Sequence, residues 1–593
     1  MKTQLLIAFL ILSLTSFDSE ALDDPFLQDI QIRQQLIQQQ QDIERTRKSQ
    51  EIKRVREKSQ DVKIDLKQKD FFDDGFCAKI DQFVILGNNA LKIDKFADPQ
   101  IGKCLTKTDL KNIKDSIENY YIEKGYFLAR VYFDTKRMGL GIVEIVIEEG
   151  ILSDLKIEDN SIINKKFSWR RKLQKFFAFG FYKNKTVNLR DIEQGLDQIN
   201  RLSSNYAQME LEPANQDGYS DITIKNQIGF LTKPSIEINN SGNENTGRIK
   251  HNFILNQDNL LGINDNIYFS HSKTDYDGVN KRYSKSNYLS FSAPFSYYTF
   301  GGSYSDSDYL ITTPGILSNQ VSAGSSKSIS YYVSKVLIRD QKYKISAKAQ
   351  MSNASNKSFS DGVFLKISSR ELAVAKLSFD NVFYTKTGSI FLQPKYNRGT
   401  RMMGSDADEV GLTKNAEKLQ FQSYGIYGSM NNKFPLPKTS FNFSHNISFD
   451  AQYSKDRLFA SEQIAIGGRY NVRGFEESSI SGDNGYYIKN DLTANLLQFM
   501  PQKINNPAAR KLAQRLSASI FYDYGYVRNK IINDQRDEGY MSGTGVKLSY
   551  SGQFLTAGLT YSKGLHSPQF LRNIDKITKD GESIYFDVKF GLF

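Results

Sequence analysis

The side chains that most often do chemistry are few in this chain of 593 residues, and they lie far apart. The four histidines are His251, His271, His445 and His566, and none has a nucleophile and an orienting acid at the spacing of a catalytic set. Two cysteines are too few for a zinc ribbon, which needs four ligands. No Gly-rich phosphate loop follows a predicted strand. The sequence therefore predicts no catalytic residue, no metal site and no cofactor.

The two cysteines, Cys77 and Cys104, have a different use if the chain leaves the cytosol, because an oxidising compartment favours a disulfide. Residues 1–21 indicate such an export. An apolar run over residues 5–14 precedes Ser19-Glu20-Ala21, which fits a small-x-small cleavage site. The run is about ten residues long, too short to span a bilayer. We therefore expect a signal peptide over 1–21 and an oxidised pair, with two buried free thiols as the alternative.

Composition and charge exclude several further classes of protein. The chain has 78 Lys+Arg against 66 Asp+Glu, a net charge of +12, but these cations are spread among Ser, Asn, Gly and Tyr. Nucleic-acid-binding proteins gather theirs in a stripe on one module, so we expect no nucleic-acid partner. Mean hydropathy is −0.49, and no apolar run of about 18 residues follows the N-terminal region, which excludes a helical membrane protein. The length indicates several domains.

Residues 22–60 predict a long polar helix. From residue 26 to residue 60 the chain contains neither Pro nor Gly and is rich in Gln, Glu, Arg and Lys, which are good helix formers. Its apolar residues are too sparse to form a wide core-facing stripe. Two interpretations stay open, a solvated arm or a helix that plugs a polar, water-filled channel. Residues 61–75 are interpreted as a linker.

Residues 76–150 and 151–228 predict two small α/β modules of one topology, which amounts to an internal repeat of about 75 residues. In both, the hydrophobic period changes between that of strands and that of helices. The first module is expected to contain a strand over 77–86, a helix after Thr108, and strands over 127–133 and 142–147. The second is expected to contain a strand over 152–157, helices over 167–177 and from Asn188, and strands near 207–211 and 221–224.

Residues 229–593 predict an all-β transmembrane barrel of about 16 antiparallel strands. Segments of about ten residues alternate polar and apolar between Gly, Asn, Asp and Ser turns, as barrel strands do. In the last segment, 584–593, every second residue from Ile584 to Leu592 is apolar, and the segment ends in Phe593. A soluble all-β stack would also alternate. The expected export, the aromatic segment ends and Phe593 favour the barrel.

The spacing of the strands predicts how this barrel is oriented. Short turns face the periplasm and long loops, such as 455–485 and 564–583, face the exterior. An even number of strands returns both ends of the barrel to the periplasm, so the two modules must lie below it. A barrel this wide encloses an aqueous lumen, which could house the polar helix.

Four stretches of the chain match the motifs of one known family, in that family's order. They are Cys77-Ala78-Lys79-Ile80 with Gly102-Lys103-Cys104, the helix from Asn188 to Leu202, the turn from Asp258 to Asp265, and Val472-Arg473-Gly474-Phe475 with Phe521-Tyr522-Asp523-Tyr524-Gly525. Over essentially the whole mature chain the protein resembles TpsB proteins, the outer-membrane transporters of two-partner secretion of haemolysin-activator type, in the BamA-like superfamily. The two modules then resemble POTRA modules.

The resemblance implies a transporter without catalysis or cofactor. POTRA modules in the periplasm would capture a large secreted β-helical exoprotein, unfolded, by adding its strands to their sheet edges. The exoprotein would then cross the barrel and fold outside. The family's surroundings are outer-membrane lipid and the barrel-assembly machinery that inserts it, and its members act mostly as monomers. The alternatives are a barrel-assembly factor of the same superfamily, which usually carries more POTRA modules, and a porin.

The resemblance also implies roles for the paired motif residues. Loop 455–485 is long enough to fold back into the lumen, where Arg473 would need a partner because a charge removed from water is costly unless paired. We expect a bidentate pair with Asp523, placed at the far edge of a strand over 515–523. Gly474 and Gly525 would allow close backbone approach. The alternative is a solvated Arg473 and a turn residue at 523.

Overall fold

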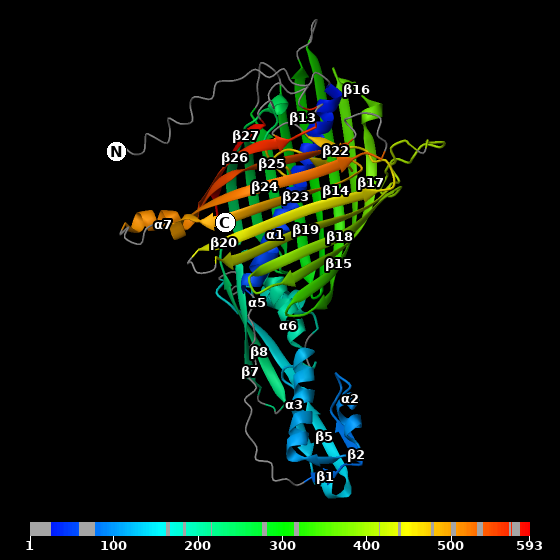
Figure 1. The fold of residues 1–593 in the computed structure, drawn as a ribbon, viewed down its shortest axis with the longest axis vertical. Helices are drawn as coiled ribbons and strands as arrows, with labels where there is room; N and C mark the ends of the chain where they lie inside the picture. Colours follow the sequence, from blue (N-terminus) through cyan, green and yellow to red (C-terminus); the bar gives the residue numbers. More distant parts are fainter. Residues whose placement is uncertain are drawn as a thin grey trace.

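The computed structural model describes most of the chain. It describes residues 25–58, 77–161, 167–181, 185–214, 216, 218–275, 282–313, 319–413, 415–436, 441–475, 479–499, 506–530, 538–568, 571 and 581–592. The expected signal peptide (1–21), the expected linker (61–75) and Phe593 lie outside these residues. Figure 1 shows a barrel of long strands with one helix inside it and two small modules below.

Sixteen long antiparallel strands close the barrel, as the sequence predicts. They are β9 (Thr232–Asn239), β10 (Lys250–Asp258), β11 (Asn266–Thr274), β12 (Tyr283–Phe295), β13 (Tyr298–Thr313), β14 (Gln320–Arg339), β15 (Tyr343–Ser360), β17 (Arg370–Tyr384), β18 (Gly388–Thr400), β19 (Gln422–Pro435), β20 (Asn442–Ser454), β23 (Asn484–Asn495), β24 (Leu516–Arg528), β25 (Glu538–Ser551), β26 (Leu555–His566) and β27 (Glu582–Gly591). The ring closes where β27 pairs with β9, from Asp587 opposite Asn239 to Gly591 opposite Ser235. The two-residue strand β16 (Val363–Phe364) pairs only with the end of β15.

Side chains alternate between the two faces of this wall. In β27, Ile584 and Phe590 are about half exposed on the outer face, whereas Tyr585 is buried and Asp587 accepts a hydrogen bond from Arg469 inside the barrel. Outward apolar and inward polar residues are the pattern that lipid outside and water inside require. Among the helices of the described residues, none is long and apolar enough to cross a membrane.

Strands β13, β14 and β15 run well past the spans that the hydrophobic pattern predicts. The hydrophobic pattern indicates strands over 297–306, 327–337 and 342–352, but β13, β14 and β15 have 16, 20 and 18 residues. The ladder between β13 and β14 continues to Thr313 opposite Gln320, through Ser-, Gly- and Asp-rich sequence. Backbone pairing does not need an apolar face, so hydrophobic alternation ends at the membrane edge while pairing continues. Figure 1 shows these strands rising to the top of the barrel.

The first module packs one long helix on a three-stranded sheet, in the order β2-β5-β4. Its core includes Ile117, Tyr121, Val143 and Ile145. The side chain of Thr106 caps the long helix in a capping box with Asp109. The elements are β1 (Cys77–Lys79), β2 (Gln82–Leu86), α2 (Asp94–Ala97), η2 (Asp98–Gln100), β3 (Cys104–Thr106), α3 (Lys107–Glu123), β4 (Arg130–Asp134), η3 (Met138–Leu140) and β5 (Ile142–Glu148).

The single strand expected over 77–86 is in fact two. β1 pairs with β3, and a disulfide between Cys77 and Cys104 joins the same two strands. The backbone N–H of Ile80 then bonds to Lys103 O, whereas that of Asp81 bonds to Gly141 O. The chain changes pairing partner at this point, and an apolar pattern by itself does not report such a change.

The second module repeats the plan with sheet order β6-β8-β7, and it lies directly against the barrel (Figure 1). Asn188 caps its second helix by accepting a hydrogen bond from the backbone N–H of Arg190. The elements are β6 (Ile151–Asp159), α5 (Ser168–Phe179), α6 (Leu189–Asn200), β7 (Asn205–Pro213) and β8 (Tyr219–Ile228). The remaining elements are α1 (Pro25–Lys58), η4 (Glu244–Thr246), η5 (Lys366–Ser368), β21 (Ile464–Ile466), β22 (Ile480–Gly482), η6 (Leu496–Phe499) and α7 (Pro507–Arg515).

Candidate functional site

The polar helix α1 lies inside the barrel and runs its length. Near its N-terminus, Arg33 donates to Ser358 Oγ and to the backbone oxygen of Lys357, both at 2.9 Å. At its C-terminus, Lys58 donates to the backbone oxygens of Leu202, at 3.4 Å, and Asn205 of the second module. A helix without a wide apolar stripe thus finds polar partners along its whole length.

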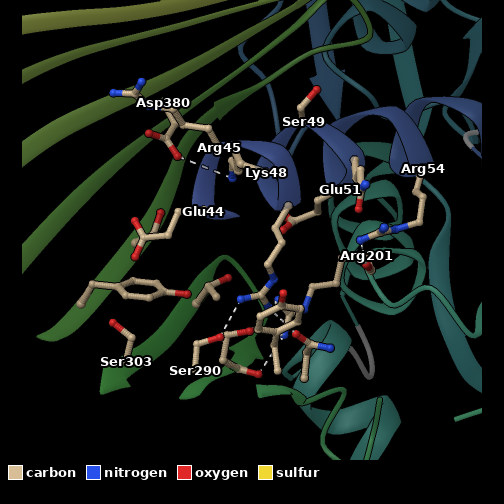
Figure 2. A pocket seen from close by; sticks show the side chains of 18 of the residues that line it. Glu44, Arg45, Lys48, Ser49, Glu51, Arg54, Arg201, Ser290, Ser303 and Asp380 are labelled. Atoms are coloured by element: carbon tan, nitrogen blue, oxygen red, sulfur yellow. Dashed lines mark hydrogen bonds and ion pairs between the residues drawn. The ribbon is translucent and has the colours of Figure 1, made fainter. Parts of the chain in front are cut away.

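Cations in the middle of α1 hold it to opposite parts of the wall. Arg45 bonds to Asp450 and Tyr487. Arg47 donates to Ser290 Oγ at 2.6 Å and Asn266 Oδ1 at 2.7 Å. Figure 2 shows the next such contact, in which Lys48 Nζ lies 3.5 Å from Asp380 Oδ2. Only four apolar side chains of α1 are buried among the described residues, and they are Ile32, Leu36, Ile52 and Val55.

A cavity of about 710 Å³ remains beside α1 at the periplasmic end of the lumen. Its lining comes from α1, from α6 of the second module and from the barrel wall, and Figure 2 shows Arg54 of α1 beside Arg201 of the module. The lining is rich in Lys, Arg and Ser. A space of this kind holds water, so the plug does not seal the lumen by tight apolar packing.

The loop between β20 and β23 folds back into the barrel and brings Arg473 to Asp523. The guanidinium Nε and Nη2 donate to the two carboxylate oxygens at 2.6 and 2.8 Å, and the backbone N–H of Arg473 donates at 3.1 Å. Arg473 is 7 % exposed and Asp523 is fully buried. The guanidinium also lies 3.5 Å from the centre of the Phe521 ring. This is a bidentate, desolvated pair, held in one orientation.

Two apolar side chains and two glycines of the motifs pack around this pair. Val472 and Phe475 are buried in a cluster with Ile466 and Ile480 of the small hairpin β21–β22. Gly474 has φ of 104°, and a Cβ there would lie 2.5 Å from the backbone N of Gly564. A Cβ on Gly525 would lie 2.8 Å from Ile466 Cγ2. Both glycines are therefore needed for the loop to reach the wall.

One placement expected from the sequence is wrong. β24 continues to Arg528, so Asp523 lies in the middle of its strand and not at its far edge. The Tyr- and Gly-containing sequence after Asp523 is typical of a turn. In the structure these residues continue β24 and pair with β23 and β25 to its end. The carboxylate is therefore held by a rigid wall.

Sequence reasoning missed three further contacts of the folded-back loop. Arg473 Nη1 also donates to Asp491 at 2.8 Å, and Arg469 Nη2 donates to Asp587 of β27 at 2.9 Å. A Cβ on Gly543 would lie 1.8 Å from the backbone oxygen of Arg473. Asp491 and Asp587 lie at positions that the alternation of side chains along their strands directs into the lumen. The alternation therefore marks both as possible partners of a loop cation, but it does not say which cation each of them meets.

The second module is coupled to the barrel by a buried ion cluster around Asp197 of α6. Lys344 Nζ lies 3.1 Å from its carboxylate, and Arg339 bonds to the same oxygen. Burial alone would raise the pKa of Asp197, but the two cations outweigh burial and lower that pKa. Arg201 of the same helix segment donates to the backbone oxygen of Ser292 at 2.9 Å. The module is thereby fixed below the lumen.

The histidines do not meet one another. His251 contacts Asp275 at 2.8 Å, His271 contacts Asn287 at 2.7 Å and His445 contacts Asn490 at 2.5 Å. In the part of the chain that the structure describes, no group of three His, Cys, Asp or Glu side chains is placed to hold a metal ion.

A 16-stranded barrel with a polar plug, a folded-back loop and two modules at the periplasmic rim defines a class, the outer-membrane barrel transporters. Within that class, the chain belongs to the family described as haemolysin secretion/activation protein ShlB/FhaC/HecB, which matches residues 218–550. A POTRA domain of ShlB type matches residues 79–150, and a POTRA domain matches residues 154–213. The resemblance stated from the motifs is thus confirmed.

Known relatives match this chain over most of their own length. The chain is 28 % identical over 475 residues to the outer membrane transporter CdiB of Escherichia coli O6:K15:H31, which covers 79 % of this chain and 75 % of the relative. It is 24 % identical to the hemolysin transporter protein ShlB of Serratia marcescens, covering 75 % and 73 %. Among solved structures, CdiB from Escherichia coli superimposes with a TM-score of 0.82 at 25 % identity, covering 94 % of this chain and 98 % of that one. The protein is an outer-membrane transporter of two-partner secretion with a secreted exoprotein as its partner, and its POTRA modules lie in the periplasm.

Proposed function

We propose that the protein exports one dedicated exoprotein by capturing it unfolded on the POTRA modules and passing it through the barrel lumen after α1 has left. The observation that carries the proposal is the character of the plug. Hydrogen bonds and ion pairs beside water contribute little each, because water replaces the partner that is lost. Helix α1 is held mainly by such contacts and by few buried apolar side chains, so the lumen is closed by an element that can be displaced.

Capture requires a surface that accepts an extended chain. The two POTRA sheets have β2 and β4, and β6 and β7, as their edge strands. Tyr132 of β4 and Tyr206 and Leu211 of β7 are exposed. An edge strand offers unpaired backbone groups, and neighbouring apolar side chains favour a bound strand. Because β7 lies next to the barrel entrance, it would pass the exoprotein directly to the lumen.

Direction would come from the exoprotein and not from a reaction. We propose that the transporter carries out no catalytic step and binds no cofactor. A β-helical exoprotein that folds outside the cell buries apolar surface there and does not slide back unfolded. Insertion by the barrel-assembly machinery, action as a monomer and a β-helical partner belong to the same proposal.

The test is a deletion of the gene, followed by quantitative proteomics of the culture supernatant and of the outer membrane. We expect one or two very large proteins to disappear from the outside while the outer membrane stays unchanged, and a plasmid copy to restore them. Broad loss of many barrel proteins would instead identify an assembly factor. No change in either fraction, with the protein demonstrably made, would revive the porin interpretation.

A further inference from the structure

The periplasmic connection between β23 and β24 is much longer than its neighbours. It runs from residue 496 to 515 and carries η6 and α7, whereas the fully described connections on this side span only residues 259–265, 296–297, 340–342, 385–387 and 552–554. Figure 1 shows α7 projecting sideways from the periplasmic rim of the barrel, away from the two POTRA modules. Joining two adjacent strands does not require such a helix.

Helix α7 separates apolar from cationic side chains. Ala509, Leu512 and Ala513 follow the i, i+3, i+4 spacing of one face, and Arg510 and Lys511 lie off that face. Ala513 is buried at the rim, but Leu512 is 52 % exposed. The apolar face is therefore only partly covered by the chain itself.

Helix α7 is capped at its start and attached to the barrel at its end. At its start, the side-chain oxygen of Asn506 accepts hydrogen bonds from the backbone N–H groups of Ala508 and Ala509, at 3.0 and 3.3 Å. At its end, Asn495 Nδ2 donates to the backbone oxygen of Gln514 at 2.8 Å, and Arg515 donates to Tyr550 Oη at 3.2 Å. The helix is thus attached to strands β23 and β25 and does not swing freely.

The connection leaves the barrel at the height of the membrane interface. Phe499 of η6 is half exposed, and its ring lies 5.0 Å from that of Phe441 at the foot of β20. Phe434 and Phe443 stack at 6.0 Å on the neighbouring strands. Exposed aromatic side chains at one rim of a barrel mark the boundary between lipid and water. The connection that carries α7 therefore begins at this boundary.

The charge of this segment has one sign. Between Asp491 and Asp523 the sequence contains no Asp or Glu, and α7 contributes Arg510, Lys511 and Arg515. No acidic side chain in the described part of the chain pairs with Arg510 or Lys511. Cations beside an apolar face at a membrane boundary favour anionic headgroups.

We propose that α7 lies in the periplasmic leaflet of the outer membrane as an interfacial helix, with Leu512 in the acyl region and Arg510 and Lys511 on the phosphates of anionic phospholipids. The same connection joins the two strands that hold Asp491 and Asp523. Lipid bound at α7 would therefore steady the part of the wall that anchors the folded-back loop. This inference rests on the barrel and not on the export route.

The test uses the full-length chain in nanodiscs, with the polarity-sensitive dye NBD on a single introduced cysteine. The native cysteines form a disulfide, so only the introduced thiol reacts. With L512C in phosphatidylcholine and phosphatidylglycerol, we expect the dye to be quenched by doxyl lipids and protected from iodide. The matched control is Q514C on the opposite face, where we expect the reverse. Equal iodide quenching at both positions would overturn the proposal.

Charge variants separate lipid from other sources of phosphate. Replacing phosphatidylglycerol by phosphatidylcholine, or combining L512C with R510Q and K511Q, is expected to reduce the doxyl quenching to the same lower level. If inorganic phosphate added to phosphatidylcholine nanodiscs restored the full effect, the site would bind free anions and the lipid assignment would fail. Protection of L512C that appears only with a periplasmic extract would identify a protein partner and would equally overturn it.

Discussion

At the scale of single residues, Arg473 is the side chain on which the folded-back loop depends most. It donates to two carboxylates, Asp523 and Asp491, and covers the ring of Phe521. Removing one member of a buried pair is costly because the other charge stays buried without a partner, typically about 3–5 kcal/mol. This cost destabilises the folded-back position of the loop. It does not affect the barrel wall, because backbone hydrogen bonds hold the strands together.

We therefore predict that Arg473→Ala leaves the barrel inserted but impairs export. Insertion is measured by the heat-dependent shift of the barrel on gels, and export by the amount of exoprotein in the supernatant. Arg473→Lys keeps the charge but loses the forked pair of donors. Its export should therefore lie between that of the wild type and that of Arg473→Ala. The control is Arg401→Ala, at an exposed arginine of an extracellular loop. Normal export by Arg473→Ala would show that the pair has no part in transport.

The motif residues could be named from the sequence because four stretches of the chain match the family's motifs in the family's order. Asp491 could not be named, since its closeness to Arg473 depends on the register that sets it opposite Phe521. Register follows from the closure of the whole barrel and not from either strand alone. The same holds for Asp587, which meets Arg469 across the lumen.

At the scale of elements, the cations of α1 hold the plug in the lumen. We predict that the double variant Arg45→Gln and Arg47→Gln opens more often than the wild type in planar bilayers, because both side chains lose their wall partners. Lys53→Gln is the control, because this exposed lysine pairs only with Glu57 of its own helix among the described residues. Identical opening frequencies of all three proteins would mean that these contacts do not hold the plug.

The disulfide stabilises the first POTRA module alone. It closes a loop with a sequence separation of 27 residues, for which the chain-entropy picture gives about 3–4 kcal/mol. Reduction, or Cys77→Ser with Cys104→Ser, should speed hydrogen exchange in residues 77–150 and leave that of the barrel strands unchanged. Unchanged exchange in the module would contradict this assignment.

The contact between the second POTRA module and the barrel should depend on pH. The cations Arg339 and Lys344 lower the pKa of Asp197 when module and barrel are together. The contact is then fully favoured above the ordinary carboxyl pKa, about 4, and is lost as the pH falls through the lowered value. Energy transfer between dyes on the module and on the barrel should drop on acidification, and Asp197→Asn should abolish this dependence. A rise in energy transfer when the wild type is acidified would contradict the predicted sign, and an unchanged pH dependence in Asp197→Asn would show that another group is responsible.

Element positions were the easiest part to predict, because strand and helix periods are local properties of the sequence. The 16 strands and both modules were found in this way, and family and fold are confirmed. The failures share one cause. The upper halves of β13 to β15 and the break between β1 and β2 depend on which strand pairs with which, and side-chain hydrophobicity does not encode pairing.

At the scale of the whole molecule, the barrel decides what the polar helix does. From its sequence, α1 was equally compatible with a solvated arm, because it has no apolar stripe that names a partner. A closed wall with inward Ser, Asn, Asp and Tyr side chains supplies the polar partners that make a plug possible. The POTRA modules, the entrance cavity and the plug then lie along one route from the periplasm to the exterior.

The most direct test of this route is to lock α1 in place. Arg33→Cys and Ser358→Cys place two thiols on either side of a contact at the extracellular end of the lumen, where a short bis-maleimide reaches them in cells. The account predicts that the cross-linked double variant inserts normally and exports no exoprotein, while each single variant treated with the same reagent exports at the wild-type level. Undiminished export by the cross-linked protein would contradict passage through this lumen.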